Sequence, residues 1–303
     1  GFIGLKLIKN LEDCGYSIRI LSRNNNLDYD TVICDLQNEK IPESALDSID
    51  VIFHLAGHTL DLASDSIQEK IYYDVNVGGT VKLIKIAVKK KLRKFIYVSS
   101  VKAGGVIDEN KCISESDQST PNDIYGITKR EAEIEVLRMS EQYDIHVSII
   151  RPALVYGEKM KGNLANMFNG IKSGWFPPLP EVYNKRSMIH ISDLISAMLL
   201  IARDSRTNGQ IYIATDGYQY SSRSIYKAIC SATGKKIPAW IVPKSIFYIL
   251  AKIGDVVKFF PFNSYKYKKI FGNEYYSSEK LNNLGFSPKY NLFTYLERYD
   301  KKE

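Results

Sequence analysis

The sequence predicts an α/β fold with a doubly wound parallel sheet and a smaller second α/β domain. Through about residue 150, short β-branched or apolar runs alternate with longer helical patterns, which is typical of consecutive βαβ units. After Arg151-Pro152, glycines and the cluster Pro177-Pro178-Leu179-Pro180 break this pattern into loops and short helices. The length of 303 residues is sufficient for two domains of ordinary size.

The expected elements follow in chain order. Short apolar runs predict buried parallel strands at 17–21, 32–34, 51–55, 95–99 and 147–150. Helical periodicity predicts helices at 5–14, 72–90, 124–143, 221–233 and 244–258. We expect a first domain over residues 1–160, to which 187–215 returns through a strand at 210–214, and a second domain formed mainly by 161–303.

Composition and charge narrow the class of protein. Hydrophobic residues make up 45% and charged residues 25%, which excludes a disordered or collagen-like chain. The net charge of +7 is expected to be spread along the chain, with Lys89 to Lys91 as its one tight run, so nucleic acid is not a predicted partner. The cysteines, histidines and acids show no metal-ligand spacing, so no metal is predicted, and four separate cysteines indicate a reducing cytoplasm.

No signal peptide or transmembrane segment is expected in the residues shown. The sequence begins at Gly1 without Met, a basic region or an apolar region. The longest apolar stretch, 245–262, is interrupted by Lys252, Asp255 and Lys258, so it is too short to span a bilayer. We favour packing of this helix on its own domain, and an amphipathic helix on a membrane surface is the alternative.

The first residues, Gly1-Phe2-Ile3-Gly4, run directly into an apolar-periodic helix. With a preceding strand and one more glycine, they would form the end of the glycine-rich turn of a Rossmann-type fold. The helix N-terminus of such a turn accepts a pyrophosphate. We therefore expect a dinucleotide-binding first domain whose central, first strand is missing from the chain shown.

The residues after the second glycine indicate which dinucleotide is bound. An acid about 20 positions further on binds the ribose of NAD, whereas an arginine accommodates the 2′-phosphate of NADP. Here the strand ends at Ser22-Arg23, so the sequence favours NADP over NAD. In the alternative, Arg23 is an ordinary loop residue and Asp28 or Asp30 reaches the ribose.

A tyrosine and a lysine predict the chemistry. Tyr125 and Lys129 are four residues apart on one face of an expected helix, and Ser99-Ser100 ends a strand 25 residues earlier. A tyrosine with an ordinary pKa near 10 can exchange a proton at working pH only if a nearby cation favours its phenolate. We predict that Tyr125 exchanges the proton, that Lys129 is this cation, and that Ser100 assists.

On these residues the sequence resembles the extended short-chain dehydrogenase/reductase superfamily, in its nucleotide-sugar epimerase and dehydratase branch, over nearly the whole chain. Five more motifs carry the resemblance: Cys34-Asp35-Leu36, His54-Leu55-Ala56-Gly57, Asn76-Val77-Gly78-Gly79-Thr80, Arg151-Pro152 through Gly157, and Arg186-Ser187-Met188-Ile189-His190-Ile191-Ser192-Asp193. The resemblance implies cofactor contacts for Gly1, Phe2, Ile3, Gly4, Ser22, Arg23, Asp35, Leu36, Leu55, Ala56, Gly57, Asn76, Ser99, Tyr125, Lys129 and Pro152.

Within this branch the chain is similar to bacterial surface-polysaccharide enzymes that act at C4 of UDP-linked acetamido sugars. This similarity implies substrate contacts for Ser100, Asn163 and Arg186, the arginine meeting a phosphate. Leu154 stands where the family pattern usually has Asn, so Asn163 is the expected substitute. Val101-Lys102 stands where dehydratases carry an acidic pair, so 4,6-dehydration is not expected.

The resulting hypothesis is NAD(P)-dependent hydride transfer at C4 of a UDP-activated acetamido hexose. The enzyme would be a 4-ketosugar reductase or a 4-epimerase in surface polysaccharide biosynthesis, and Arg23 slightly favours the reductase because NADPH exchanges freely. The resemblance also implies a homodimer. Two alternatives stay open: a membrane-associated hydroxysteroid-type dehydrogenase of the same superfamily, and a non-catalytic protein that senses the cofactor.

Overall fold

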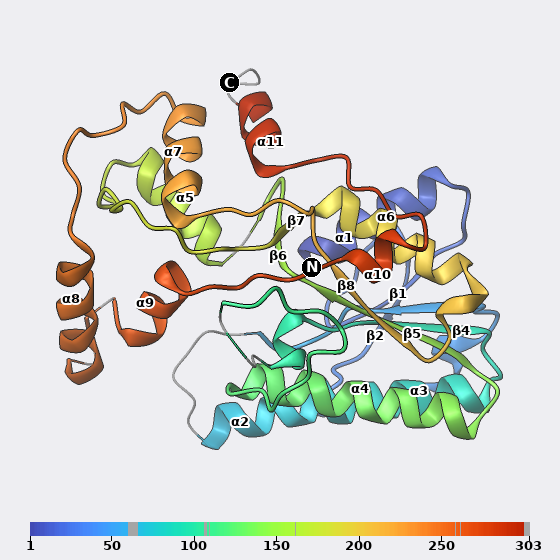
Figure 1. Ribbon diagram of the computed structural model, residues 1–303. Coiled ribbons are helices and arrows are strands. Elements are labelled where there is room, and N and C mark those ends of the chain that lie inside the picture. The colour runs from blue at the N-terminus through green and yellow to red at the C-terminus, as the bar shows by residue number, and fades with distance from the viewer. Residues whose placement is uncertain are drawn as a thin grey trace.

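The computed structural model describes residues 1–59, 66–105, 108, 110–160, 162–257, 259–260 and 262–299. A parallel sheet in the order β3-β4-β5-β8 forms the centre, with helices on both of its faces (Figure 1). Its strands are β3 (Val51–His54), β4 (Lys94–Val98), β5 (His146–Pro152) and β8 (Gln210–Ala214). Two smaller parallel sheets pair β1 (Arg19–Ser22) with β2 (Asp30–Ile33) and β6 (Leu154–Tyr156) with β7 (Met188–His190).

The described residues form eleven α-helices. They are α1 (Phe2–Asp13), α2 (Ser66–Tyr72), α3 (Thr80–Lys89), α4 (Ile124–Gln142), α5 (Asn163–Lys172), α6 (Ile191–Arg203), α7 (Ser222–Ala232), α8 (Lys244–Val256), α9 (Ser264–Phe271), α10 (Glu279–Asn282) and α11 (Leu292–Tyr299). Three short 3-10 helices are η1 (Glu43–Leu46), η3 (Val101–Gly104) and η4 (Ser205–Thr207), and one π-helix is η2 (Tyr73–Gly79). The predicted α/β class with parallel strands is confirmed.

The central strands are buried because apolar helices cover both faces. β4 and β5 are almost wholly buried, which is why most of their residues are apolar. α3 and α4 pack on one face and α6 on the other, so the wrapping is doubly wound (Figure 1). The predicted strand at 210–214 is confirmed with these bounds, and it pairs with β5 from Ser148↔Gln210 to Pro152↔Ala214.

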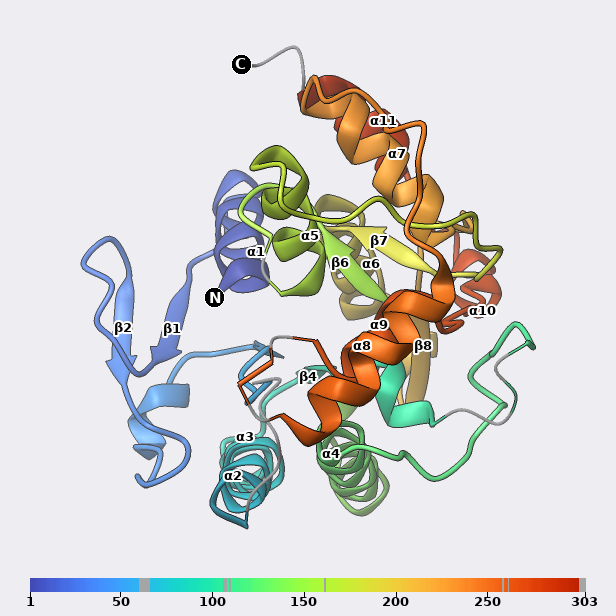
Figure 2. The same cartoon turned by 90° about the vertical axis from the view of Figure 1, so that its left-hand side faces the viewer.

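The structure differs from the predicted elements in two places. The expected helix 72–90 consists of α2, the π-helical turn η2 and α3, and the wider turn places Asn76 inside the protein. β1 and β2 pair with each other and lie apart from the central sheet (Figure 2). No described strand joins the sheet of β1 and β2 to β3. The central strand that was expected before Gly1 stays a prediction.

The second apolar core lies among β6, β7 and the helices of the C-terminal half. Tyr156, Phe168, Met188 and Tyr226 are among its buried side chains, contributed by β6, α5, β7 and α7. α8 was expected over 244–258 and ends at Val256, and Lys258 lies outside the described residues. In the described part of the chain, no helix is long and apolar enough to cross a membrane.

Candidate active site

Ser100 and Tyr125 meet where η3 packs against the first turn of α4. Ser100 precedes η3, and its Oγ accepts a hydrogen bond from the Lys102 amide at 3.2 Å. Asp123 caps α4 by accepting from the Gly126 amide at 2.7 Å, which fixes the turn that carries Tyr125. A Cβ atom on Gly126 would lie 2.7 Å from the Lys102 carbonyl oxygen, so only glycine permits this close approach.

The Tyr125 hydroxyl is buried beside Ser100. Burial raises the pKa of Tyr125 to about 12, a hydrogen bond with the Ser100 side chain opposes this rise, and the nearby Asp123 charge adds to it. The sequence predicted Lys129 as the group that lowers this pKa. In the structure Ser100 lowers it, and the effect of Lys129 on the pKa of Tyr125 stays a prediction.

Lys129 lies one turn further along α4 and is 3% exposed. Its Nζ donates to the Val98 carbonyl oxygen at 2.7 Å and lies 4.3 Å from the centre of the Tyr97 ring. Burial lowers the pKa of Lys129 to about 7, although the Glu133 charge opposes this shift. The Lys129 amino group can therefore take up a proton when a partner that accepts hydrogen bonds binds next to it.

Two predicted cofactor residues, Asn76 and Gly57, come together beside Lys129. Asn76 is fully buried, and its side chain accepts from the His58 amide at 2.7 Å and donates to Thr128 Oγ1 at 3.1 Å. A Cβ atom on Gly57 would lie 3.3 Å from Asn76 Oδ1 and 3.9 Å from Lys129 Nζ. Asn76 thereby ties the loop after β3 to α4 and leaves little room for a side chain at Gly57.

The polar groups around this loop fit a bound dinucleotide. The Ser99 hydroxyl is buried and has no hydrogen-bond partner among the described residues, although a buried hydroxyl normally has one. Pro152 ends β5 next to the strand that leads to Ser99. Together with Lys129, these residues would hold the nicotinamide ribose.

The other predicted cofactor residues lie along α1 and β1 and in the loops that follow β1, β2 and β3. Gly1 precedes α1, no described side chain caps this helix, and its first turn carries no acid, as an anion-binding N-terminus requires. Arg23 is exposed just after β1. Asp30, the alternative ribose ligand, is bound by Arg19 Nε at 2.6 Å. No hydrogen bond between described residues joins this group to Tyr125. The group also includes the predicted cofactor residues Phe2, Ile3, Gly4, Ser22, Asp35, Leu36, Leu55 and Ala56.

Arg186, the predicted phosphate ligand, is already ion-paired. Its Nη2 donates to Glu274 Oε2 at 2.8 Å, and its Nη1 donates to the Lys269 carbonyl oxygen. Glu274 also binds Lys102. Burial alone would raise the pKa of Glu274, but the charges of Arg186 and Lys102 together lower it to about 2. Asn163 is exposed at the start of α5, and no hydrogen bond among the described residues links it to Arg186.

Sequence reasoning missed Glu274 and Lys102 as a pair. They are 172 residues apart, and their pairing brings the segment after α9 to the turn that follows Ser100. The one available signal was a single carboxylate at the end of a lysine-rich stretch. This cluster joins the proposed phosphate ligand to the proposed catalytic turn.

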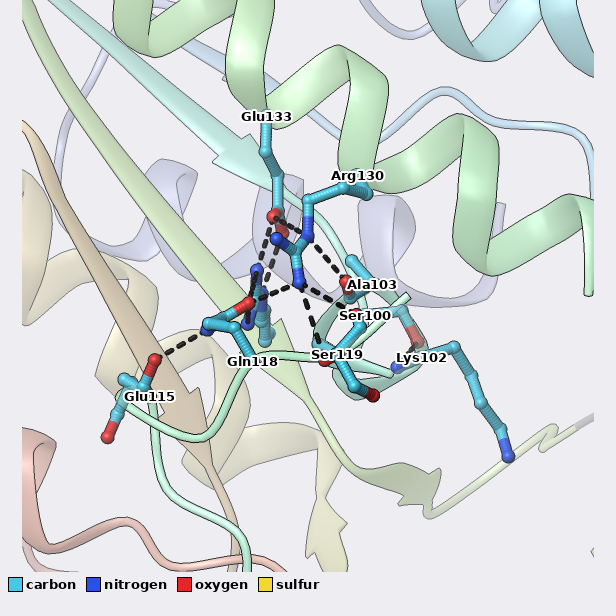
Figure 3. Close-up of polar contacts among 10 residues, drawn as sticks. Ser100, Lys102, Ala103, Glu115, Gln118, Ser119, Arg130 and Glu133 are labelled. Atoms are coloured by element: carbon cyan, nitrogen blue, oxygen red, sulfur yellow. Dashed lines mark hydrogen bonds and ion pairs between the residues drawn. The ribbon is translucent and has the colours of Figure 1, made fainter. Parts of the chain in front are cut away.

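A second buried network, also missed, holds η3 against α4. Figure 3 shows Arg130 and Glu133 extending from α4 toward Gln118, Ser119 and Ala103. Arg130 Nε donates to the Ala103 carbonyl at 2.7 Å, and Arg151 Nε donates to Glu133 at 2.8 Å. Arg151 and Glu133 are each 1% exposed, so the pair fixes β5 to α4 beneath the site.

The histidines have structural roles where the structure shows their contacts. His190 Nδ1 accepts from the Ser192 amide at 3.3 Å and so caps α6. His54 Nε2 is hydrogen-bonded to Thr80 Oγ1 at 2.8 Å. Among the described residues, no group of three His, Cys, Asp or Glu could hold a metal ion.

Two known proteins are similar to this chain over most of its length. The chain is 27% identical over 257 residues to the UDP-glucose 4-epimerase of Vibrio cholerae, covering 82% of this chain and 77% of that protein. It is also 27% identical over 312 residues to the N-acetyl-alpha-D-glucosaminyl-diphospho-ditrans,octacis-undecaprenol 4-epimerase of Escherichia coli O157:H7, covering 98% and 91%.

A solved structure shows the same fold. The UDP-glucuronic acid 4-epimerase of Bacillus cereus, in complex with UDP-glucuronic acid and NAD, superposes with a TM-score of 0.79 at 20% identity, covering 100% of this chain and 96% of that one. Residues 1–214, which hold the Ser100, Tyr125 and Lys129 group, match the family of NAD dependent epimerases and dehydratases. The chain therefore belongs to the NAD dependent epimerase/dehydratase family, the branch of the extended short-chain dehydrogenases/reductases that its motifs resemble.

Proposed function

We propose that this chain is an NAD-dependent 4-epimerase of a diphosphate-activated acetamido hexose. The observation that carries the proposal is the buried pair of hydroxyls, Ser100 and Tyr125, beside the buried ammonium of Lys129. A secondary alcohol can be oxidised only if its proton leaves as its hydride is transferred, and a positioned tyrosine serves this purpose. When bound, NAD supplies the hydride acceptor next to that alcohol.

Each of the three side chains has one role in this proposal. Tyr125 Oη takes the proton from the sugar O4 and later returns it. Ser100 Oγ donates its one hydrogen bond to the same O4, which orients the sugar; without substrate that hydrogen bond is made with Tyr125 and lowers its pKa. Lys129 holds the nicotinamide ribose and regains its positive charge there, which further favours the Tyr125 phenolate.

Epimerase and reductase differ in what happens to the cofactor. Sequence reasoning slightly favoured a reductase with NADP because of Arg23, whereas both relatives named above are 4-epimerases. In an epimerase the 4-keto sugar rotates within the site and takes the hydride back on its other face, so the cofactor is not consumed. We propose epimerisation, with reduction of a 4-keto sugar as the second candidate because exposed Arg23 suits NADPH.

Arg186 and Lys102 support a diphosphate as the part of the substrate that the enzyme binds. Both cations converge on Glu274, and an arginine can bind a phosphate with two parallel hydrogen bonds. We propose that the diphosphate binds Arg186 while Glu274 holds the guanidinium in position. This charged cluster is a poor surface for a steroid, which argues against the hydroxysteroid alternative.

The test is turnover with a defined set of substrates. Protein is incubated with UDP-GlcNAc, UDP-GalNAc and the matching 4-keto sugar, each with NAD, NADH, NADP or NADPH, and products are identified by NMR. An epimerase interconverts the first two without consuming cofactor, and a reductase consumes NADPH in proportion to product. Cofactor binding with no turnover of any sugar would instead support the sensor.

A further inference from the structure

The outer surface of α8 is apolar although it is exposed. Phe247 and Ala251 form the buried face of this helix, at 4% and 0% exposed. On the opposite face, Ile249, Ile253 and Val256 are 57%, 43% and 82% exposed. A helix that is apolar all round is normally buried all round, so the outer face indicates a second apolar surface that covers it.

This apolarity extends beyond one helix. Half of the exposed large hydrophobic side chains in the described residues fall between residues 237 and 265. They include Trp240 and Phe259, which are 63% and 98% exposed. Aromatic and branched side chains that are exposed along one segment are typical of a protein that inserts into the boundary of a bilayer.

The same segment is strongly basic. Residues 235–270 contain eight lysines and a single acid, Asp255, so eight minus one gives a local charge of +7. Residues 82–94, with seven cations and no acid, are equally basic, so the positive charge is not confined to this segment. Within residues 235–270, Lys252 and Lys268 are exposed on α8 and α9. Lysines around an apolar surface match the negative charge of an anionic lipid bilayer.

The arrangement of α8 and α9 leaves this surface open. They lie at one end of the molecule in Figure 1, and they are nearest the viewer when that end is turned forward in Figure 2. The end of α9 is fixed to the proposed substrate site, because Arg186 donates to the Lys269 carbonyl oxygen. A surface that α8 and α9 touch would thus lie next to the phosphate-binding arginine.

From these observations we infer that α8, α9 and the residues before them, 237–269, dock onto an anionic phospholipid bilayer. The apolar side chains enter the lipid boundary, and the lysines bind the headgroups. Resting on the proposed function, the inference has a consequence for the substrate: a sugar diphosphate anchored in that bilayer by an apolar chain reaches Arg186 directly.

The test is co-sedimentation with vesicles of phosphatidylcholine alone or of equal parts phosphatidylcholine and phosphatidylglycerol. We expect binding to the mixed vesicles, weakening as salt increases. Ile249→Gln/Val256→Gln should weaken this binding about tenfold or more. The matched control is Ile33→Gln/Ile134→Gln, at sites 58% and 54% exposed on β2 and α4, which should bind like the native protein. Lys252→Gln/Lys268→Gln should reduce only the binding that depends on phosphatidylglycerol.

Each outcome decides the inference. No binding to the mixed vesicles, or equal binding by the α8 variant and its control, would overturn it. Loss of a dimer in the α8 variant, seen by light scattering without vesicle binding, would show that a second copy covers the surface. Turnover of UDP-GlcNAc without vesicles is measured separately, so failure of docking and failure of the proposed function remain distinguishable. The α8 variant should convert a vesicle-borne sugar diphosphate more slowly than the native protein does, and it should convert UDP-GlcNAc at the native rate.

Discussion

Arg186 and Glu274, 88 residues apart in the chain, form an ion pair of 2.8 Å that also includes Lys102. Two cations share one carboxylate, so the cluster keeps an excess of positive charge beside the turn that follows Ser100. A diphosphate can satisfy that excess without first displacing Glu274. The carboxylate fixes the direction of the guanidinium, which a free arginine on a loop would lack.

Removal of the Tyr125 hydroxyl tests the proton carrier. Tyr125→Phe should reduce kcat by about two orders of magnitude or more, the scale of general acid–base catalysis. The measurement is turnover of the sugar substrate, with cofactor binding and thermal unfolding as controls for the fold. A variant that keeps more than about a tenth of the native rate would contradict the assignment.

A methyl group at Gly126 tests the approach of α4 to η3. The added Cβ of Gly126→Ala would lie 2.7 Å from the Lys102 carbonyl oxygen, so the two elements must separate. We expect kcat to fall because Ser100 and Tyr125 move apart. Gly78→Ala is the control, since its Cβ would make an ordinary contact of 3.7 Å. Equal rates in the two variants would show that the close approach is unimportant.

The Glu274 carboxylate should stabilise the fold in a manner that depends on pH. Its pKa is lowered from the ordinary 4.5 to about 2, so its contribution is complete above pH 4.5 and is lost as pH falls toward 2. Glu274→Gln should reduce the free energy of unfolding by about 1–3 kcal/mol at neutral pH. Denaturant titrations across this range should show the two proteins converging in acid; a constant difference would disagree with the ion pair.

The chemistry of the guanidinium is tested by Arg186→Lys. Lysine offers a point charge where arginine offers two parallel hydrogen bonds, so KM for a UDP-sugar should rise about tenfold or more. Cofactor affinity should change little, and UDP should compete with the substrate. If UDP does not inhibit and KM is unchanged, Arg186 serves the fold alone.

Cofactor choice is tested by Arg23→Ala. If Arg23 binds the 2′-phosphate, the variant should lose about 1.5–3 kcal/mol of binding free energy for NADP and little for NAD. Titration of both cofactors against the native and variant proteins measures this difference. A native preference for NAD, with no effect of the substitution, would fit the epimerase and leave Arg23 as a loop residue.

Much of the fold followed from local patterns. The apolar runs predicted β3, β4, β5 and β8 because strands buried on both faces carry almost no polar residues. The ends of β3, β4 and β5 differ from the prediction by at most two residues, since hydrogen-bond pairing and not apolarity decides where a strand ends. Tyr125 and Lys129 could be found because their spacing lies within one helix.

What the sequence by itself determined, then, was the α/β class, the order of elements and the residues whose chemistry is local. The tertiary structure decided which distant groups meet: Glu274 with Arg186 and Lys102, and Arg151 with Glu133. It also decided that Ser100 lowers the pKa of Tyr125, and that one face of α8 stays exposed. The physical reason is that burial and long-range electrostatic interactions depend on distances between elements, and periodicity along a chain carries no such distances.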